Sequence, residues 1–390
     1  MDFSPSSEQT LLSDTARRFL EHELGEAAER YGDASMPTKT LRNLLQSIAP
    51  MGYLGSRIAT EEGGRGLDFV SVMLLYEELF RIFPSLGAAA FVNDVVAFAI
   101  HRDGTEAQRR EYLPGLISGE LIACQAATEP EVGSNVGAIR MKAVRHGEDY
   151  RLSGRKVWIT NGDHADICIV VARTGGPGPG GLSRLIVERQ PAGFTSRELP
   201  TLGQQGCSTA EVVFDQTEVP ASRLLGGEGA GLANTLTDFE ATRCYAAIGA
   251  VGIAAAALEA ATRYAQEREQ WGRAIAGHQL VQALIADMAT ELDAARLLTL
   301  RASDMVSRGV RCEAEAAMAK YYATEAGVRI TSNAIQVHGA LGLSRDLPIE
   351  RYFRDARMMT IPDGTSQIQA LIIARQRLGV AAFGDAGASQ

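Results

Sequence analysis

The chain has little of several residue types, and each shortage argues against a class of protein. Cysteine occurs five times in 390 residues, at positions 124, 168, 207, 244 and 312, without any C-x-x-C pair. An odd, scattered set of this kind predicts neither a disulfide framework nor a zinc site, and no bound metal is expected. A reducing, cytoplasmic compartment suits such cysteine usage best.

Positive charge and long apolar runs are also scarce. The chain has 38 Lys+Arg against 47 Asp+Glu, a formal net charge of -9, which disfavours nucleic acid as a partner. The longest apolar run, residues 249–258, is Ala-rich and too short to span a bilayer. The first residues, MDFSPSSEQTLLSD, carry acidic side chains where a signal peptide would be positive. The sequence therefore predicts a soluble protein without a membrane partner.

The remaining composition is that of a globular protein. Hydrophobic residues make up 46% and charged residues 22% of the chain, which excludes fibrous and disordered classes. The length suggests roughly two to three domains. Residues 1–120 show a helical period, with Val72, Leu75, Tyr76 and Leu79 on one face. We expect an all-helical N-terminal domain there.

Residues 121–225 have a different texture, with short β-branched stretches separated by Gly, Pro, Asn and Asp. The stretches 149–153, 156–160 and 167–171 are typical strands, so a small β-barrel or sandwich domain is expected. The run GGPGPGG at 175–181 has no periodicity and no bulky residue. It predicts a flexible surface connection between two strands.

Residues 226–390 return to long helical periods. Their Ala-rich apolar faces suit a C-terminal four-helix bundle, because small residues let helices approach closely. The predicted helices cover 232–270, 279–308, 313–339 and 365–378. The predicted fold class is therefore α+β, ordered as a helical domain, a β domain and a helical bundle.

Two motifs in the β domain contain residues suited to ligand contact. The segment 124–135 places Thr128 and Gly133-Ser134 in a loop whose small side chains would let a ligand come close. Trp158 and Thr160, two places apart, lie on the same face of a predicted strand. Taken alone, the first motif is more typical of a structural turn than of a ligand site, and a tryptophan in a strand usually belongs to the core.

Taken in order, these and other motifs resemble the acyl-CoA dehydrogenase family over almost the whole chain. The resemblance rests on EGGRGLD at 62–68, GTEAQ at 104–108, YLPGLISGE at 112–120, TEP at 128–130, WITNG at 158–162, the segment 252–268, RDA at 354–356 and GTSQI at 364–368.

The resemblance implies noncovalent FAD as the cofactor, held between the β domain and the bundle and completed by a neighbouring subunit. Thr128, Trp158 and Thr160 would contact the isoalloxazine ring, and Arg268 the pyrophosphate. The pyrophosphate of the partner subunit's FAD would be approached by Gln336 and Gly339, followed by Ala340 where the family usually has a second Gly. Further cofactor contacts are implied at Ser134, Gln270, Trp271, Gln279, Thr365 and Gln367.

The resemblance also implies a catalytic base of unusual type. Most members carry Glu in a Tyr-Glu-Gly-Thr segment, whereas this chain has Pro362-Asp363-Gly364-Thr365, so Asp363 is the expected base. Another branch places its Glu on the first bundle helix, where this chain has Thr242. Substrate contacts are implied at Ser134, Glu240, Arg243 and Gly364. An alternative for Asp363 is the N-cap of the helix that follows it.

The function implied is FAD-dependent α,β-dehydrogenation of an acyl thioester, with Asp363 removing the α-proton and hydride passing to flavin N5. Pro362-Asp363 and the short loop 175–181 resemble the branch acting on carrier-protein-bound acyl groups in secondary metabolism, so CoA and a carrier protein both stay open. Electron-transferring flavoprotein or oxygen is the implied acceptor, and a homotetramer or homodimer the implied assembly. The alternatives are a nitroalkane-oxidase-like flavoenzyme and a catalytically inactive flavin-binding relative.

Overall fold

A computed structural model describes residues 5–190 and 193–382, in which helices come first, then strands, then helices. This order confirms the predicted α+β class. Chain contacts divide the molecule into two compact units. Unit 1 contains the described residues of Met1–Gly25, Phe69–Pro84 and Glu240–Gln390, and unit 2 those of Glu26–Asp68 and Ser85–Phe239. Residues 1–4 lie outside the described ranges. They begin the N-terminal segment whose acidic side chains argue against a signal peptide.

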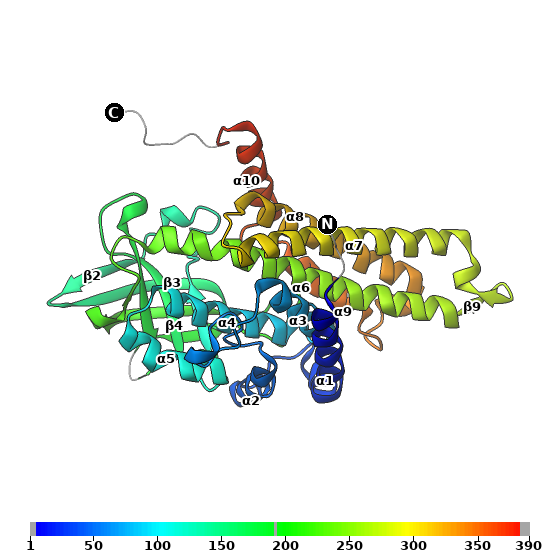
Figure 1. Cartoon of the computed structure of the whole chain (residues 1–390), viewed down its shortest axis with the longest axis horizontal. Coiled ribbons are helices and arrows are strands. Elements are labelled where there is room, and N and C mark those ends of the chain that lie inside the picture. Colours follow the sequence, from blue (N-terminus) through cyan, green and yellow to red (C-terminus); the bar gives the residue numbers. More distant parts are fainter. Residues whose placement is uncertain (1–4, 191–192, 383–390) are drawn as a thin grey trace. The chain divides into compact units, whose positions relative to one another are not determined.

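The helices before the sheet are α1 (Ser7–Tyr31), α2 (Thr38–Ile48), α3 (Phe69–Ile82), α4 (Pro84–Asp103) and α5 (Glu106–Ser118) (Figure 1). A capping box starts α5, since the Thr105 hydroxyl accepts from the backbone of Gln108, whose side chain accepts from the backbone of Thr105. Gly119 ends the helix in the left-handed conformation. Two of the sequence motifs, GTEAQ and YLPGLISGE, are thus the two ends of one helix.

The strands of unit 2 form a mixed sheet in the order β6-β7-β3-β2-β4-β5-β8, with β1 paired in parallel to β4. Neighbours on the main path are antiparallel except for β2 and β4. The bounds are β1 (Ala123–Ala126), β2 (Lys142–His146), β3 (Asp149–Thr160), β4 (Ile167–Arg173), β5 (Leu182–Glu188), β6 (Thr195–Glu198), β7 (Thr209–Val219) and β8 (Leu224–Leu225).

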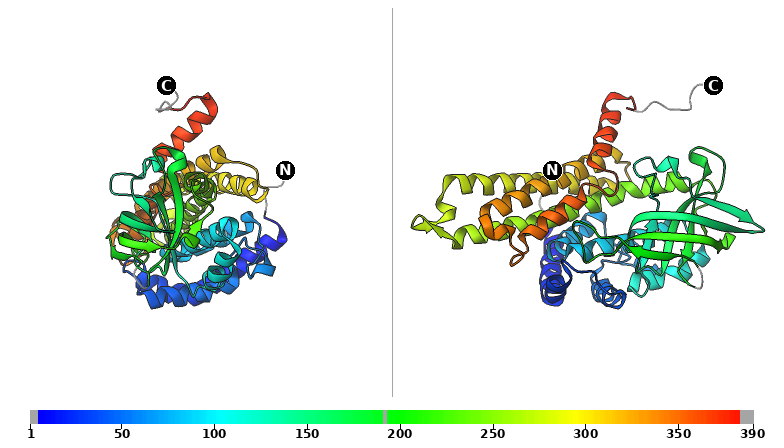
Figure 2. Two further views of the ribbon diagram at one scale, coloured as in Figure 1. Left: turned by 90° about the vertical axis from the view of Figure 1, so that its left-hand side faces the viewer. Right: turned by 180° about the vertical axis from the view of Figure 1, so that it is seen from behind.

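Both faces of this sheet are covered, which explains why β4 is apolar at nearly every position. Ile167 and Ile169 pack in one cluster with residues of α4 and α5. Cys168 and Val170 belong to the opposite cluster, which also contains residues of β2, β3, β5 and β7. The green strands and the cyan helices beside them are seen in Figure 2. The sheet therefore curves around a core of its own, with helices on its outer side.

The glycine-rich run 175–181 joins β4 to β5, as predicted, but it is fastened rather than loose. The backbone N–H groups of Thr174 and Gly175 donate to Gly181 O, and Arg173 Nη1 donates to the carbonyls of Gly176 and Gly178. A Cβ on Gly181 would lie 1.9 Å from Gly176 O. Glycine is needed because the loop folds back on itself, and the expectation of flexibility missed these bonds.

The helices after the sheet are α6 (Gly231–Glu267), α7 (Gln279–Ser307), α8 (Glu313–His338), α9 (Ile349–Met359) and α10 (Ser366–Leu378). Four of them were predicted to within a few residues. The sequence did not predict α9, which is short and buries the charged residue Asp355 among its few inward positions. It also missed a small hairpin, β9 (Glu269–Gln270) with β10 (Arg273–Ala274), between α6 and α7.

Close helix packing in unit 1 depends on small residues. A Cβ at Gly252 of α6 would lie 2.4 Å from Glu77 O of α3, so only glycine permits this approach.

By length and apolarity, α4 and α6 could each cross a membrane, although the longest apolar run in the sequence did not indicate this. However, 78% and 72% of their most apolar windows are buried within the protein, as in core helices.

Candidate active site

Asp363 lies in the turn between α9 and α10, where the backbone is strained. Its φ is 55° and that of Gly364 is 92°, so two successive residues adopt the left-handed region. The N-cap of α10 is Thr365, whose hydroxyl accepts from the Ile368 N–H at 3.4 Å. The N-cap alternative for Asp363 is therefore wrong, because a different residue caps this helix.

Two buried polar side chains hold this turn by its carbonyl groups. Lys320 Nζ, from α8, donates to Gly364 O at 2.8 Å. Gln369 Nε2, from the first turn of α10, donates to Asp363 O at 3.0 Å and to Gly364 O at 2.8 Å. Both side chains are fully buried. Sequence reasoning found neither residue, because no local pattern connects position 320 with position 363.

The groups around the Asp363 carboxylate come from α6 and α8. Burial raises the pKa of Asp363, while the charge of Lys320, hydrogen bonding by Thr242 and the charge of Arg243 oppose the rise. Burial lowers the pKa of Lys320 to about 8, against the attraction of Asp363. The positive charge of Lys320 therefore favours the ionised form of the Asp363 carboxyl group.

Thr242 occupies the position at which the other branch of the family would carry its base. Its hydroxyl is buried and lies close enough to the Asp363 carboxyl group to favour the ionised form, but within the described residues it makes no hydrogen bond of normal geometry. Arg243, the next residue, is also buried, and burial lowers its pKa although the charges of Glu313, Asp363 and Glu240 oppose this. The structure therefore brings together Asp363, Thr242, Arg243 and Lys320.

Glu240, a predicted substrate contact, has partners within the protein. Its Oε2 accepts from the backbone N–H of Cys312 at 3.3 Å and lies 3.8 Å from Cys312 Sγ. Its Oε1 lies 3.8 Å from Arg311 Nε. These contacts tie α6 to the segment just before α8, so the visible role of Glu240 is structural.

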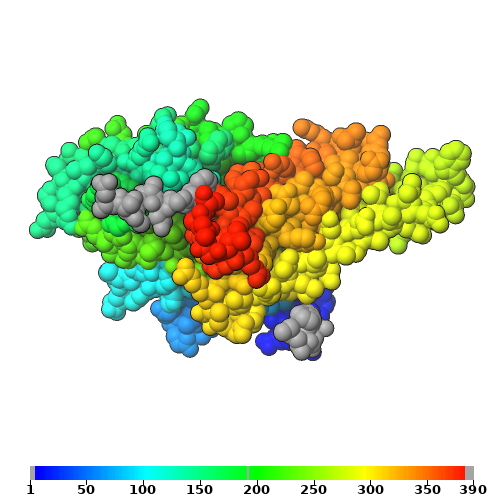
Figure 3. Space-filling model, turned by 90° about the horizontal axis from the view of Figure 1, so that it is seen from above, coloured from blue at the N-terminus to red at the C-terminus, as the bar shows by residue number. Residues whose placement is uncertain are grey.

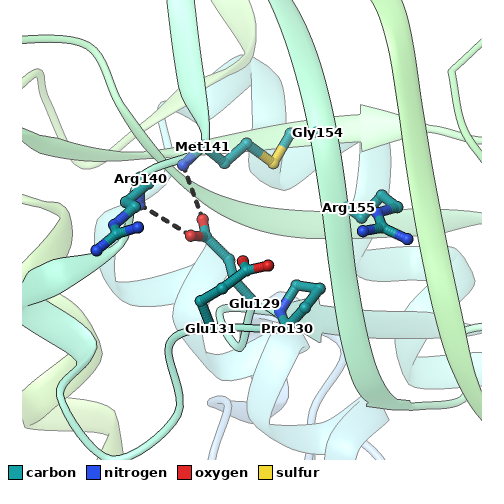
Figure 4. A pocket seen from close by; sticks show the side chains of 7 residues that line it. All are labelled: Glu129, Pro130, Glu131, Arg140, Met141, Gly154 and Arg155. Atoms are coloured by element: carbon teal, nitrogen blue, oxygen red, sulfur yellow. Dashed lines mark hydrogen bonds between the residues drawn. The ribbon is translucent and has the colours of Figure 1, made fainter.

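The second group of predicted residues lies in unit 2, beginning with the TEP loop. Glu129 is buried, and its carboxylate accepts from the backbone N–H groups of Arg140 at 2.9 Å and Met141 at 2.8 Å (Figure 4). It also accepts from Lys156 Nζ at 2.9 Å. Burial alone would raise the pKa of Glu129, but these hydrogen bonds and the Lys156 charge lower it. Glu129 therefore anchors the loop as a carboxylate whose pKa lies below its ordinary value.

The pocket drawn in Figure 4 lies beside this anchor and is lined by residues 129–131, 140–141 and 154–155. Its volume of 210 Å³ is below the size of ordinary ligand sites, which begin at about 300 Å³. The carboxylate of Glu129 that borders it is already hydrogen-bonded. We therefore do not place the cofactor in this pocket.

Trp158 stands on a β-bulge. Between Lys156 and Ile159, strand β3 advances three residues while its partner β7 advances two, from Val212 to Ala210, which leaves one extra residue on β3. Trp158 has φ 61° and 61% of its surface is exposed. An exposed indole held by a bulge is not a core tryptophan, so the structural alternative for this residue is wrong.

Thr128 and Thr160 complete this group. The Val157 N–H donates to Thr128 O at 3.0 Å, which fastens the TEP loop to the strand that carries Trp158. Thr160 is partly buried like Thr128, and Ile159 between Trp158 and Thr160 points into the core. The exposed flat face of the Trp158 indole suits contact with a planar heteroaromatic ring such as isoalloxazine. Ser134, in the same loop, is exposed.

A third group lies at the tip of the β9–β10 hairpin. Trp271 and Gly272 have φ 57° and 73° between paired Gln270 and Arg273, which is the geometry of a type I′ turn. Trp271 is 93% exposed. Arg268, Gln270 and Gln279 are also exposed. This end of the bundle, yellow-green in Figure 3, projects away from the red helix α10.

Gln336 and Gly339 lie at the other end of α8 from the Asp363 turn. Gln336 follows Lys320 by 16 positions in the helix, which separates them by roughly 24 Å. Gln336 and Gly339 are exposed, as is Gln367 on α10. His338 is buried and its ring stacks on Tyr264 at 4.4 Å, so it is structural. Within unit 1, the predicted FAD contacts and Asp363 therefore do not form one small site.

Comparison with known proteins identifies one family along the chain. Its sequence profiles match in order: acyl-CoA dehydrogenase, N-terminal domain, at residues 6–120; middle domain, at 124–217; and C-terminal domain, at 229–378. Together these matches cover most of the 390 residues.

Individual relatives span nearly the full length. An acyl-CoA dehydrogenase of Bacillus subtilis is 38% identical over 380 residues, which cover 96% of this chain and 99% of the relative. The caffeyl-CoA reductase-Etf complex subunit CarC of Acetobacterium woodii is 33% identical over 373 residues, 94% of this chain and 97% of the relative.

Solved structures agree with the fold. Glutaryl-coenzyme A dehydrogenase in complex with glutaryl-CoA superposes with a TM-score of 0.93 at 33% identity, covering 97% of both chains. A glutaryl-CoA dehydrogenase of Mycobacterium smegmatis in complex with FADH2 gives a TM-score of 0.91 at 29% identity, covering 97% of this chain and 96% of that chain.

Proposed function

Because this chain belongs to the acyl-CoA dehydrogenase family of flavoenzymes, we propose that it catalyses the α,β-dehydrogenation of an acyl thioester with Asp363 as base. FAD is its cofactor, as in the family and in the relative whose structure contains FADH2. The observation that carries the proposal is the Asp363 turn. The Asp363 carboxylate in this turn lies beside Thr242, the position of the alternative base, and it does not cap a helix.

FAD, when bound, supplies the hydride acceptor at flavin N5. Thr128, Trp158 and Thr160 would hold its ring, since the indole offers a flat surface and the threonines offer hydroxyl groups. Arg268 would hold the pyrophosphate of the partner subunit's FAD, because a guanidinium group matches phosphate oxygens in a bidentate manner. Ser134, Gln270, Trp271, Gln279, Thr365 and Gln367 complete the proposed set, with Gln336 and Gly339 at the partner's pyrophosphate.

Asp363 would remove the proton from the carbon next to the thioester carbonyl. Burial raises the pKa of this carboxyl, which makes it a better proton acceptor than an exposed aspartate. Aspartate is one methylene shorter than glutamate, which withdraws the carboxylate by about 1 Å, a shift that can cost about 100-fold in rate. The substrate must therefore bind correspondingly closer to the turn, with Gly364 and Arg243 as its proposed contacts.

The proposed substrate is an acyl group on a phosphopantetheine thioester, of CoA or of a carrier protein. Support for CoA comes from the relatives, whose names specify caffeyl-CoA and glutaryl-CoA. Support for a carrier protein comes from the Pro362-Asp363 pair and from loop 175–181, which offers neither Lys nor an aromatic residue. The net charge of -9 requires a local basic patch if an acidic carrier is to dock.

We further infer the acceptor, assembly and location. The Etf complex named for the Acetobacterium woodii relative supports electron-transferring flavoprotein as the acceptor, with oxygen as the alternative.

The separation of Gln336 from the Asp363 turn supports a homotetramer or homodimer, because one chain cannot bring both to one cofactor. Five buried, unbridged cysteines fit a cytoplasmic location.

The test is anaerobic bleaching of the flavin absorbance by acyl-CoA and by the same acyl group on a carrier protein. We expect bleaching with at least one, and a loss of about 100-fold or more in its rate for Asp363→Asn with FAD retained. Asp304→Asn, which changes an exposed aspartate of α7 paired with Arg308, is the matched control. Bleaching by nitroalkanes alone would contradict the thioester proposal, and unchanged turnover in Asp363→Asn would exclude Asp363 as the base.

A further inference from the structure

The Asp363 turn adopts a conformation that needs support from outside itself. A non-glycine residue at φ 55° is disfavoured, and such conformations persist only where surrounding contacts fix them. The turn has no regular secondary structure of its own, since α9 ends at Met359 and α10 begins at Ser366.

The external contacts converge on two neighbouring carbonyl groups. Gly364 O accepts from both Lys320 Nζ and Gln369 Nε2, each at 2.8 Å, and Asp363 O accepts from Gln369 Nε2 at 3.0 Å. Within the described residues, Gln369 Oε1 is buried without a hydrogen bond. An unsatisfied buried acceptor is costly, so the two bonds from the donor side of the Gln369 amide to the turn must offset that cost.

Lys320 differs from Gln369 in carrying a charge. The charged groups that act on it are Asp363 in the turn, Arg243 on α6 and Glu325 on α8 itself. The charges that act on Asp363 are those of Lys320 and Arg243. Lys320 is therefore the cation that both bonds the turn and favours the ionised form of its carboxyl group.

We propose that Lys320 and Gln369 are positioning residues that hold the Asp363–Gly364 turn in the conformation from which Asp363 takes the substrate proton. The inference rests on the proposed role of Asp363. Gln369 acts through hydrogen bonds alone, whereas Lys320 acts through a hydrogen bond and through its charge. The two residues therefore have different experimental signatures.

The test compares Lys320→Met, Gln369→Met and Lys320→Arg in the FAD-loaded enzyme, using the rate of flavin reduction at saturating acyl thioester. We expect both methionine variants to lose between about 10-fold and about 100-fold, because the turn is released and the base is misplaced. Lys320→Arg should recover much of the loss, since it keeps a cationic donor. Thr331→Val is the matched control, a buried substitution eleven positions further along α8.

The pH dependence separates the two roles. Removing the cation raises the pKa of Asp363, so the acidic limb of the rate profile should move to higher pH in Lys320→Met. It should stay in place in Gln369→Met, which loses no charge. Difference infrared spectroscopy of the Asp363 carboxyl band, assigned by its absence in Asp363→Asn, measures the same titration without turnover.

The outcomes are distinguishable from failure of the proposed function. If Asp363→Asn still turns over, the role of Asp363 is wrong and the inference falls with it. If Asp363→Asn is inactive but both methionine variants stay within about twofold of Thr331→Val, the positioning role alone is overturned. If a methionine variant loses FAD or fails to fold, the positioning role is judged from the rate of Lys320→Arg and from the infrared titration of the remaining methionine variant.

Discussion

At the scale of single residues, the two alternative positions for a base meet in one place. Thr242 on α6 interacts with the carboxylate of Asp363, although the two residues are 121 positions apart in the sequence. A carboxylate at either position would therefore occupy the same region of unit 1.

This juxtaposition gives a prediction for a relocated base. In an Asp363→Asn background, Thr242→Glu should restore flavin reduction by about 10-fold or more, because a general base contributes about 100-fold to 10,000-fold. Thr242→Gln in the same background is the control, since it has the same size without a base. Stopped-flow bleaching measures the rates. Equal rates for the Glu and Gln variants would show that position 242 does not face the substrate.

The sequence predicted Asp363 from a motif, yet it could not predict the state of its carboxyl group. That state depends on Lys320, Thr242 and Arg243. The backbone of the turn is held by Lys320 and Gln369, and these four residues lie on three different helices. Their contacts with the turn arise from the packing of α6, α8 and α10 and leave no periodic trace in the chain. The alternative that Asp363 caps α10 failed for a local reason, because Thr365 already supplied the cap.

At the scale of elements, several motifs that carry the family resemblance contain structural signals. GTEAQ is a capping box and the final Gly119 of YLPGLISGE ends the same helix. The Glu of TEP anchors its loop on the N–H groups of Arg140 and Met141, leaving Thr128 as the motif's proposed flavin contact. Asn161 of WITNG is buried and donates to Ala89 O and Ala123 O, which fixes the end of β3.

The capping box of α5 permits a test at this scale. Thr105→Ala should lower the free energy of unfolding by about 1 kcal/mol, because the Gln108 N–H loses its acceptor. Hydrogen exchange should accelerate first in residues 106–108. Thr290→Ala, an exposed mid-helix change on α7, is the control and should not destabilise. Unchanged exchange at 106–108 would mean that packing alone holds this helix end.

At the scale of the whole molecule, the distribution of predicted cofactor contacts is informative. Thr128, Trp158 and Thr160 lie in unit 2, Asp363 in unit 1, and Arg268 and Gln336 in other parts of unit 1. Within unit 1, the separation of Gln336 from the Asp363 turn is the basis on which we propose that a second copy of the chain contributes to each site. We propose that this partner covers Trp271 at the hairpin tip, which is 93% exposed.

Subunit mixing tests this arrangement. Asp363→Asn and Arg268→Ala should each be inactive or deficient in FAD, whereas refolding them together should regain up to about a quarter of the wild-type rate in a dimer. The gain arises because one site of each mixed dimer takes its Asp363 and its Arg268 from unaltered positions. Separately refolded proteins, mixed afterwards, are the control. Absence of any gain would indicate that each chain forms its site alone.

The sequence by itself determined the class of each segment and the ends of most helices. Those properties follow from local periodicity, capping residues and turns, which act over a few positions. Ordered motifs also identified the residue types that carry the proposed chemistry. Loop 175–181 was placed correctly between two strands, but its internal hydrogen bonds depend on a fold-back that composition does not encode.

Only the tertiary structure decided how those residues are held. The bulge that exposes Trp158 needs the register of β3 against β7, and the strain at Asp363 needs donors from α8 and α10. These are long-range pairings, in which the partner of a residue is set by how elements pack and not by its neighbours in the chain. The sequence therefore predicted Asp363 as the base. It did not predict the charged groups around the carboxylate or the hydrogen bonds that hold the turn.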